Sequence, residues 1–212
     1  MCYNSRMTLF IDFDGVLFNS QKFRSDLIAQ IEKSGFSKQE VYDAYNAECL
    51  DGNYLPAGHL ARLGKIHKFN VRLAEVRIEN LANNAKKYLF SDVESSLRLL
   101  SKLPDYQLEM ISLGHPKFQP GKIKKTGISK YFQKLHFTAV PKVEYLRSIA
   151  KKKEKFIIVD DRGDALEEIA KEFSKAIAIE MRREKEVHDP AERPSHFSGP
   201  KITNLGQLIE IL

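Results

Sequence analysis

The chain has little cysteine and no long apolar run, and these absences narrow what it can be. Only two cysteines occur in its 212 residues, Cys2 and Cys49. Two cysteines form neither a disulfide framework nor a zinc constellation, so the composition fits a reducing compartment. No apolar stretch is long enough to cross a bilayer, and the first ten residues lack the apolar segment and cleavage site of a signal peptide. We therefore expect a cytoplasmic protein without a membrane partner.

The charge balance is basic, yet no basic motif accompanies it. The chain carries 34 Lys and Arg against 28 Asp and Glu, a formal net charge of +6. Such an excess favours anionic partners such as phosphate esters, nucleotides or nucleic acid. The longest basic run, KKKEK at 151–155, lies at a helix end just before an apolar run, and no nucleic-acid-binding motif occurs with it. We interpret it as a solvated helix end and expect no nucleic-acid partner.

Short apolar runs alternate with helical patterns over most of the chain. Five runs are mostly apolar rather than alternating, as expected for strands covered on both faces. They span 8–12, 108–112, 135–137, 156–159 and 176–179. Between them lie amphipathic helical patterns, and one of these begins with a Ser91–Glu94 pair typical of a capping box. Since strands alternating with helices form parallel sheets, the sequence predicts an α/β fold with a doubly wound, Rossmann-like sheet of five strands.

One stretch departs from this alternation. Between the first strand and about residue 89 there is helical periodicity without a strand pattern, with candidate helices near 21–34, 38–49, 57–69 and 71–89. We interpret residues 19–89 as an all-helical domain inserted after the first strand of an α/β core, which comprises residues 1–18 and 90–212. The polar, proline-containing stretch 182–200 indicates a long surface loop, and the final NLGQLIEIL indicates a closing helix.

Carboxylates gather where the predicted strands end. Asp12 and Asp14 follow the first strand in FIDFDGVLFN, and side chains two residues apart on a strand point the same way. Two carboxylates held close repel each other, which raises the pKa of at least one of them. The fourth strand ends in Asp160 and Asp161, with Asp164 one turn further on. Folding alone does not require this arrangement, whereas a bound cation or proton transfer would explain it.

The predicted sheet brings further polar residues to the same edge. Ligands of open parallel sheets bind at the carboxyl ends of the strands. Ser112 ends the second strand, and Lys142 opens the helix after the third, from where it can reach the site and offset charge. Four or five carboxylates at this edge require a divalent cation, and hard oxygen ligands favour Mg²⁺ bridged to a phosphate. The residues therefore predict a magnesium and phosphate site.

These residues form four motifs in a fixed order. They are DFDGVL at 12–17, Ser112 in MISLG, Lys142, and VDDRGD at 159–164. With them the chain, from about residue 8 to 179, resembles the haloacid dehalogenase (HAD)-like hydrolase superfamily, in particular its phosphatase branch. The first and fourth motifs together are specific, whereas a serine or a lysine alone is not. The helical insertion resembles the type-one cap of that superfamily, which closes over the substrate and excludes water.

The resemblance implies a role for each motif residue. Asp12 would attack phosphorus and form an aspartyl-phosphate, and Asp14 would protonate the leaving oxygen and then activate water. Asp14 would also meet the Mg²⁺ ion through its backbone carbonyl. Ser112 and Lys142 would hold and balance the phosphoryl oxygens. The other implied residues are Gly15 in the turn beside the substrate, the amides of Leu113 and Gly114 on the phosphoryl group, Asp160 on the metal, and Asp161 or Asp164 as a further ligand or its support.

Asp14 favours phosphoryl transfer over dehalogenation, because a dehalogenase has no leaving group to protonate and its family members lack an acid there. We predict a phosphatase acting on a small phosphorylated metabolite, monomeric or a weak homodimer. A phosphomutase and a catalytically weak phosphate-binding or regulatory protein remain open. Sugar phosphates, phosphoglycolate-like acids, nucleotides and pyridoxal phosphate all fit. Arg24, Arg62, Lys65 and His115 could meet the rest of the substrate, although each also fits a solvated surface residue.

Two other acid-rich sites fit the sequence less well. An EF-hand loop would place a ligand where Val16 stands, has a later glycine and does not follow a strand. A receiver domain has its acidic pair near the start and a single aspartate afterwards, which reverses the order seen here. His59 and His67 are about two helical turns apart, too far to share one metal ion, so we expect surface or structural roles for both.

Overall fold

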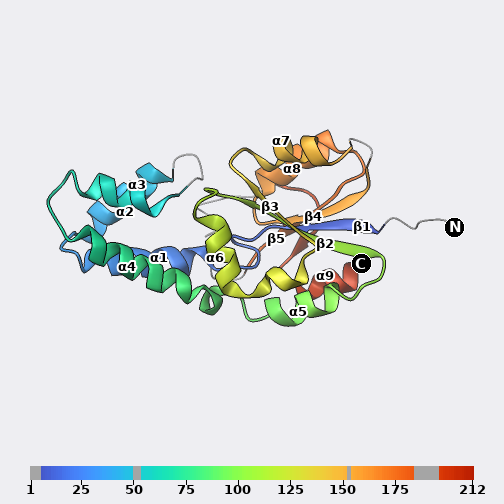
Figure 1. Cartoon of the computed structure of the whole chain (residues 1–212). Coiled ribbons are helices and arrows are strands. Elements are labelled where there is room, and N and C mark those ends of the chain that lie inside the picture. The colour runs from blue at the N-terminus through green and yellow to red at the C-terminus, as the bar shows by residue number, and fades with distance from the viewer. Residues whose placement is uncertain (1–5, 50–53, 152–153, 184–195) are drawn as a thin grey trace.

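A parallel sheet between layers of helices forms the larger part of the computed structural model, which describes residues 6–49, 54–151, 154–183 and 196–212 (Figure 1). The strand order is β3-β2-β1-β4-β5-β6, and every neighbouring pair is parallel. The bounds are β1 Met7–Ile11, β2 Tyr106–Leu113, β3 Lys134–Thr138, β4 Phe156–Asp160, β5 Ile177–Met181 and β6 Lys201–Ile202. The predicted α/β fold is confirmed. The sixth strand escaped prediction because only two residues form it, directly after a polar stretch.

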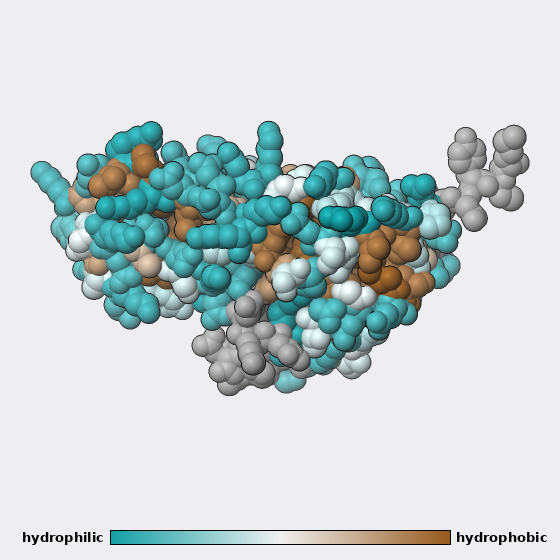
Figure 2. All heavy atoms as spheres, turned by 90° about the horizontal axis from the view of Figure 1, so that it is seen from below, coloured by the Kyte–Doolittle hydropathy of each residue, from teal (hydrophilic) through white to brown (hydrophobic). Residues whose placement is uncertain are grey.

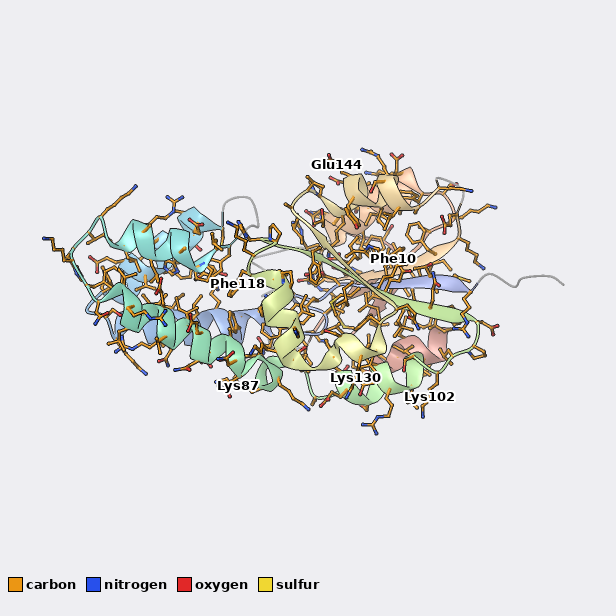
Figure 3. All side chains as sticks on the ribbon, in the orientation of Figure 1. Phe10, Lys87, Lys102, Phe118, Lys130 and Glu144 are labelled. Carbon is orange, nitrogen blue, oxygen red and sulfur yellow. The ribbon has the colours of Figure 1, made fainter. Side chains whose placement is uncertain are left out.

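Side chains of the sheet alternate between two apolar cores, which is why its strands read as continuous apolar runs. Leu9 and Ile11 of β1 belong to one core, and Phe10 belongs to the other. Phe10 meets Phe156 edge to face, with 5.5 Å between ring centroids (Figure 3). Helices α7 and α8 cover this second core, and α5 and α9 cover the first (Figure 1). The helices of this part are α5 Val93–Leu100, α6 Gln119–Thr126, α7 Lys142–Ile149, α8 Gly163–Glu172 and α9 Gly206–Ile211, with a short 3₁₀ helix, η2, at Ile128–Tyr131.

The predicted helical insertion forms a separate group of helices beside the sheet (Figure 1). It consists of α1 Ser20–Glu32, α2 Lys38–Glu48, α3 Pro56–Leu63, α4 Val71–Asn83 and the 3₁₀ helix η1 at Ala85–Tyr88. Polar side chains begin three of these helices, because Asn19, Ser37 and Asn70 each accept a hydrogen bond from a backbone amide of the first turn. We call α1–α4 with η1 the helical insertion from here on.

Two of the predicted helices end early. The third, expected to reach residue 69, ends at Leu63, since Gly64 is a poor helix former and the chain then turns to pack Phe69 against Phe36. The fourth, expected to reach residue 89, gives way to η1 after Asn83. There the side chain of Asn84 donates to the carbonyl of Asn80 at 2.8 Å and closes the helix end.

The predicted capping box of Ser91 and Glu94 is wrong. Helix α5 begins at Val93, and its N-cap, Asp92, makes no side-chain hydrogen bond to the first turn. Glu94 pairs instead with Lys86 of η1 at 3.1 Å. Within the described residues, a capping box with both of its hydrogen bonds is found at the start of α2, between Ser37 and Glu40. Glu94 thus pairs with Lys86, on the other side of the segment that joins η1 to α5, instead of capping its own helix.

The insertion leaves and rejoins the sheet through two adjacent backbone segments. Phe18 pairs with Leu89 in a β-bridge, and the amide of Asn19 donates to the carbonyl of Tyr88 at 2.8 Å. The ring of Phe18 contacts those of Phe13 and Tyr88, with centroids 4.8 and 5.6 Å away. Helix α6 packs against α4 and η1, so this helix also touches the insertion (Figure 1).

Polar residues cover most of the face shown in Figure 2, with apolar residues gathered in several patches on it. Leu99 of α5 is 53% exposed and Ile211 of α9 is 50% exposed. None of the helices in the described ranges has the length and apolar composition of a membrane span. The predicted surface loop at 182–200 lies mostly outside the described residues, as does part of the basic run at 151–155.

Candidate active site

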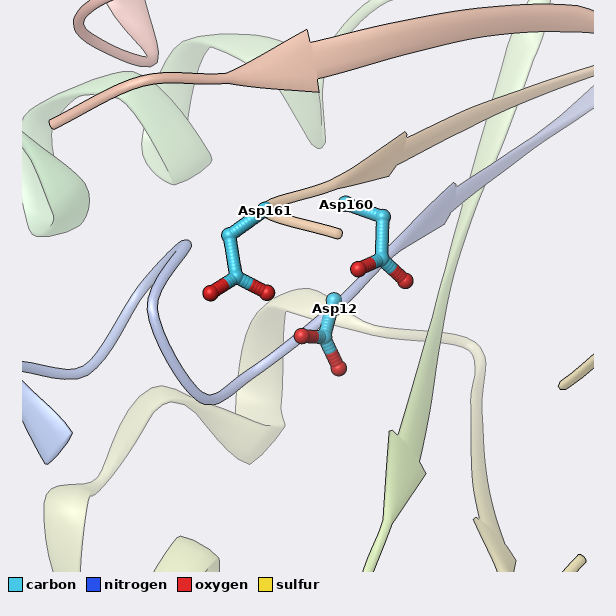
Figure 4. Close-up of side chains that lie close together, drawn as sticks. All are labelled: Asp12, Asp160 and Asp161. Carbon is cyan, nitrogen blue, oxygen red and sulfur yellow. The ribbon is translucent and has the colours of Figure 1, made fainter. Parts of the chain in front are cut away.

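Three carboxylates meet at the carboxyl ends of β1 and β4. Asp12 follows β1, Asp160 ends β4, and Asp161 comes next in the chain. The two strands are neighbours, and the amide of Asp12 donates to the carbonyl of Val159 at 2.9 Å. One carboxylate oxygen from each of the three aspartates lies within 4.8 Å of the other two (Figure 4). Asp12 and Asp160 are buried and Asp161 is half-buried, so this edge of the sheet holds concentrated negative charge.

Lys142 is the counter-charge in this group. It is the first residue of α7, its side chain is 7% exposed, and Nζ lies 2.6 Å from Oδ1 of Asp12 and 2.5 Å from Oδ2 of Asp160. Burial lowers the pKa of Lys142, but the two carboxylates raise it above its ordinary value. Lys142 is therefore charged, and the three aspartates with this lysine carry a formal charge of −2.

The donor set fits a divalent cation. Burial raises the pKa of Asp12 well above its ordinary value, Asp160 and Asp161 raise it further, and Lys142 opposes them. Burial likewise raises the pKa of Asp160, again against Lys142. Carboxylates in this state are costly to keep ionised without a further positive charge. Three hard oxygen donors around one point suit Mg²⁺, which accepts oxygen ligands and keeps the rest of its sphere for water or phosphate.

Gly15 permits the close packing of this group. Its backbone has a φ of +77°, a region that favours glycine, and a Cβ atom there would lie 2.2 Å from Oδ2 of Asp161. The next residue, Val16, is held by Arg183, whose Nε and Nη2 donate to the Val16 carbonyl at 3.1 and 2.6 Å. Arg183 is itself fixed by Asp92, since Nη1 donates to both carboxylate oxygens at 2.8 Å. The backbone turn after Asp14 is thus fixed by the packing of Gly15 on Asp161 and by the hydrogen bonds from Arg183 to Val16.

Asp14 lies at the same cavity, but its carboxylate is bound by other residues. Oδ1 accepts from Ser20 Oγ at 2.5 Å and from Lys122 Nζ at 2.8 Å, and Oδ2 accepts from Lys122 at 3.1 Å and from Gln119. Burial raises the pKa of Asp14, but Lys122, Ser20 and Gln119 together lower it below its ordinary value. The expected repulsion between Asp12 and Asp14 is therefore not the main effect, because burial raises the first pKa and three donors lower the second.

Lys122 and Gln119 were not predicted as site residues. Both belong to α6, which the crossover after β2 brings beside the turn at Asp14. Lys122 stands in a run with Lys124 and Lys125, and nothing in the sequence separates the buried lysine from its exposed neighbours. Ser20 offered a weak signal, since it follows the first motif and begins a predicted helix.

The second motif lies beneath the cavity. Ser112 is fully buried, and its Oγ accepts a hydrogen bond from Gln119 Nε2 at 2.8 Å. Leu113 lines the cavity, whereas the amide of Gly114 donates to the carbonyl of Thr138 at 3.0 Å. Of the groups expected to hold phosphoryl oxygens here, the Gly114 amide is therefore engaged within the sheet edge.

Asp164 lies outside the group of three aspartates. Its carboxylate receives hydrogen bonds from Arg162, with Nη2 2.5 Å from Oδ2, and its side chain is 66% exposed. These hydrogen bonds lower the pKa of Asp164. Asp164 still lines the cavity, but the structure places it beside Arg162 rather than beside Asp12 and Asp160.

The cavity has a volume of about 640 Å³ and lies between the strand ends and the insertion. The insertion contributes four residues to its wall, Ser20, Gln21, Arg24 and Tyr45. Arg24 thus lines the cavity, with its guanidinium 6.0 Å from the centroid of the Tyr45 ring. The other candidates are elsewhere: Arg62 pairs with Glu48, Lys65 is exposed, and His115 accepts from the amide of Lys117.

His59 and His67 take structural places in the insertion. His59 is fully buried, with Nδ1 3.1 Å from the Tyr54 hydroxyl and Nε2 3.0 Å from the carbonyl of Val41. His67 is exposed and stacks on Phe36, with 4.0 Å between ring centroids. Both residues thus belong to the insertion, His67 at its surface and His59 in its interior.

The fold of the chain recurs in known structures. Neither a family profile nor a curated protein sequence matches the chain. A protein from Burkholderia xenovorans described as a haloacid dehalogenase-like hydrolase superposes with a TM-score of 0.73 at 18% identity, covering 97% of this chain and 96% of that chain. The chain has the haloacid dehalogenase-like fold. At this identity the likeness establishes the fold alone.

Proteins with the haloacid dehalogenase-like fold that match this chain differ in their chemistry. A hydrolase of this superfamily from Bacillus subtilis, bound to magnesium, aligns over 98% of both chains with a TM-score of 0.63 and 14% identity. A β-phosphoglucomutase from Thermotoga maritima aligns over 97% of both chains, also with a TM-score of 0.63, at 13% identity. Haloacid dehalogenases match as well. The haloacid dehalogenase-like fold therefore leaves the reaction to be argued from the site.

Proposed function

We propose that the protein is a Mg²⁺-dependent phosphatase that hydrolyses the phosphoric monoester of a small metabolite through an aspartyl-phosphate. The observation that carries the proposal is the buried group of Asp12, Asp160 and Lys142, with the separate carboxylate of Asp14 at the same cavity. Phosphoryl transfer by a carboxylate needs a nucleophile, charge compensation and a second group that transfers protons. The residues around this cavity supply all three.

Asp12, Asp160 and Asp161 would hold the Mg²⁺ ion, with the backbone carbonyl of Asp14 as a further ligand. The bound ion supplies positive charge that offsets the aspartates and the phosphoryl oxygens. The proposed set omits Asp164, because its carboxylate already pairs with Arg162. Lys142 adds a second positive charge beside Asp12, which opposes the rise in the pKa of this carboxyl and orients it.

Two half-reactions follow from these positions. In the first, a carboxylate oxygen of Asp12 bonds to phosphorus while the ester P–O bond breaks. Asp14, which must first take up a proton against the effect of Lys122 on its pKa, gives that proton to the leaving oxygen. In the second, Asp14 takes a proton from water, the water oxygen bonds to phosphorus, and the bond to Asp12 breaks. Inorganic phosphate leaves, and both aspartates return to their starting states. Ser112 would hold a phosphoryl oxygen during both steps once its hydroxyl, which is buried and bonded to Gln119 outside the cavity lining, turns toward the cavity.

Asp14 separates this proposal from dehalogenation. Displacement of a halide needs no proton donor, because halide ions leave as weak bases. Here a second carboxylate reaches the cavity and is held by three side chains, Ser20, Gln119 and Lys122. A carboxylate that three side chains hold at the cavity favours a reaction in which this carboxylate transfers protons. A phosphomutase would use the same two carboxylates, and the lifetime of its phosphorylated aspartate distinguishes it from a phosphatase.

The substrate beyond its phosphoryl group would face the insertion. Arg24 and Tyr45 form part of this wall, and a cavity of about 640 Å³ admits a small metabolite. In the described residues no carboxylate lies within ion-pair distance of Arg24, whose guanidinium rests near Tyr42 and Tyr45. This wall favours a polar or anionic substrate. The insertion would act as a cap that limits access to water.

Hydrolysis of 4-nitrophenyl phosphate with and without Mg²⁺ tests the proposal, with the native protein compared against Asp12→Asn. We expect Mg²⁺-dependent release of nitrophenol by the native protein and none by the variant. Mass spectrometry after acid quenching should find a phosphoryl group on Asp12, short-lived in a phosphatase and persistent in a mutase.

Equal release by Asp12→Asn would contradict the proposed nucleophile. Failure of folded, Mg²⁺-binding native protein to hydrolyse either the aryl ester or a panel of metabolite phosphates would contradict phosphatase activity. That result would favour the phosphate-binding protein instead.

A further inference from the structure

Lys122 is a buried lysine whose charge is matched by one carboxylate. Its side chain is 7% exposed, and Nζ lies 2.8 and 3.1 Å from the two carboxylate oxygens of Asp14. Among the described residues no other carboxylate lies within ion-pair distance of Nζ. A buried ammonium group without a partner is strongly unfavourable, so Lys122 and Asp14 depend on each other.

Aromatic rings complete the surroundings of the Lys122 ammonium. Nζ lies 5.1, 4.9 and 5.7 Å from the ring centroids of Phe13, Phe18 and Phe23. Rings at such distances attract a cation through their negative faces and exclude water from it. They leave the ammonium few directions in which to donate hydrogen bonds. The side of the ammonium that meets Asp14 is therefore fixed by packing as well as by charge.

The donors to Asp14 come from both sides of the linker between sheet and insertion. Ser20 is the first residue of α1, inside the insertion, whereas Gln119 and Lys122 belong to α6. Helix α6 packs on α4 and η1 of the insertion (Figure 1). Phe118, just before α6, meets Tyr54 of the insertion at 5.6 Å between ring centroids (Figure 3). A change in the position of the insertion therefore reaches Asp14 through α1 and through α6.

We propose that Lys122 is a positioning residue that sets where the Asp14 carboxylate stands in the cavity and ties that place to the docking of the insertion. This inference rests on the proposed phosphatase function, in which Asp14 exchanges protons with the leaving group and with water. Lys122 has no contact with the site of phosphoryl transfer in this arrangement. Its effect on the reaction passes through Asp14.

The test is the dependence of the reaction on the leaving group. The value of kcat/KM reports the steps up to departure of the alcohol, when Asp14 must protonate the leaving oxygen. Phenol has a pKa of about 10, as tyrosine has, so phenyl phosphate needs this proton. The nitrophenolate released from 4-nitrophenyl phosphate is a much weaker base and needs it far less. A Lys122→Met variant should lower kcat/KM for phenyl phosphate about tenfold more than for 4-nitrophenyl phosphate, within the about 10²–10⁴-fold that general acids contribute.

Three further proteins make the result specific. Lys125→Met removes an exposed lysine from the same helix and should leave both values of kcat/KM unchanged. Asp14→Asn combined with Lys122→Met should be no slower than Asp14→Asn alone, because the lysine then has nothing left to position. Lys122→Gln keeps a polar donor of similar length, so it replaces Lys122→Met in each comparison if the methionine variant does not fold.

An equal loss on both esters, or a double variant slower than Asp14→Asn, would overturn the proposal. A crystal structure of the variant decides the matter without relying on turnover. We expect the Asp14 carboxylate to leave Ser20 and Gln119, and an unmoved carboxylate would show that Lys122 does not position it. Absence of hydrolysis by the native protein would count against the proposed function, whereas this structural comparison would still decide what Lys122 does to Asp14.

Discussion

The ammonium group of Lys142 lies 2.6 Å from the carboxylate of Asp12, and both side chains are buried. Lys142 is the first residue of α7 and Asp12 is the residue after β1, so this contact joins the start of α7 to the end of β1. A buried carboxylate that acts as a nucleophile must remain ionised. Within the described residues, Lys142 opposes the rise in the pKa of Asp12 that burial and the neighbouring aspartates cause.

Replacing Lys142 by Met should reduce both stability and activity. The substitution leaves Asp12 and Asp160 buried without their positive partner, and breaking a buried ion pair in this way costs about 3–5 kcal/mol. Urea unfolding without metal measures the loss, and Mg²⁺ should restore part of it. Lys130→Met, on an exposed lysine of η2, is the matched control and should unfold like the native protein (Figure 3). Native stability in Lys142→Met would contradict the charge balance described here.

Asp12→Asn should stabilise the protein when no metal is bound. A carboxyl group whose pKa is raised by folding destabilises the folded state at neutral pH, where it is ionised. Removing that charge should raise the free energy of unfolding at pH 7.5, as urea unfolding of both proteins without metal would measure. The advantage should shrink as the pH falls through the raised pKa of Asp12 in the folded protein, because the native carboxyl then takes up its proton.

The same pair of proteins should respond differently to Mg²⁺. Binding to the folded state alone stabilises it by about 2.7 kcal/mol at a concentration one hundred times the Kd. The native protein should gain this increment, and Asp12→Asn should gain much less because one carboxylate ligand is lost. Thermal unfolding at several Mg²⁺ concentrations measures both curves. Equal metal-dependent shifts would remove Asp12 from the metal site.

Gly15→Ala should disturb the metal site, whereas Gly127→Ala should not. Both glycines have a positive φ, +77° and +76°, so alanine adds comparable backbone strain of about 1 kcal/mol at each. A Cβ atom at residue 15 would also collide with Asp161, while at residue 127 it would meet nothing within 4 Å. We expect a loss of stability in both variants, larger in Gly15→Ala, and weaker Mg²⁺ binding in Gly15→Ala alone. Calorimetric titration with Mg²⁺ measures the difference, and equal affinities would argue against Asp161 as a ligand.

Acid should weaken the insertion through His59. Burial lowers the pKa of His59 to about 4, against about 6.5 in an unfolded chain. Between these values the unfolded state binds more protons, so the free energy of unfolding falls as the pH falls. From pH 7.5 to pH 5 the loss from His59 should be about 2 kcal/mol. Urea unfolding of the native protein and His59→Gln at both values tests this, with His67→Gln as the exposed control. Identical pH dependence in all three would contradict it.

Five of the six strands could be predicted from the sequence, because short, mostly apolar runs are typical of buried strands, whereas the two residues of β6 give no such pattern. Phe156 to Val159 is buried throughout, and this run leads directly into Asp160. Helix ends were less readable. The Ser91–Glu94 pattern has the spacing of a capping box, but Glu94 finds Lys86 across the linker, a contact that no local pattern records.

Some residues of the site could likewise be predicted from the sequence, and others could not. Asp12 and Asp160 follow adjacent parallel strands, so topology alone places them together, and Lys142 follows from its position at the start of α7. Lys122 and Gln119 depend instead on how α6 packs against the insertion. Contacts between helices that are far apart in the sequence leave no periodic signal, which is why the residues holding Asp14 emerged only from the structure.

The bridge between Phe18 and Leu89 bears on the order of folding. Strands β1 and β2 are neighbours in the sheet, yet the whole insertion separates them in the chain, and closing so long a loop slows the formation of a sheet. The helices of the insertion form from local contacts and can assemble before the strands pair. Once these helices have assembled, the two ends of the insertion lie side by side. The loop that must close before β1 pairs with β2 is then effectively shorter. We therefore expect early assembly of the insertion to speed the pairing of β1 with β2.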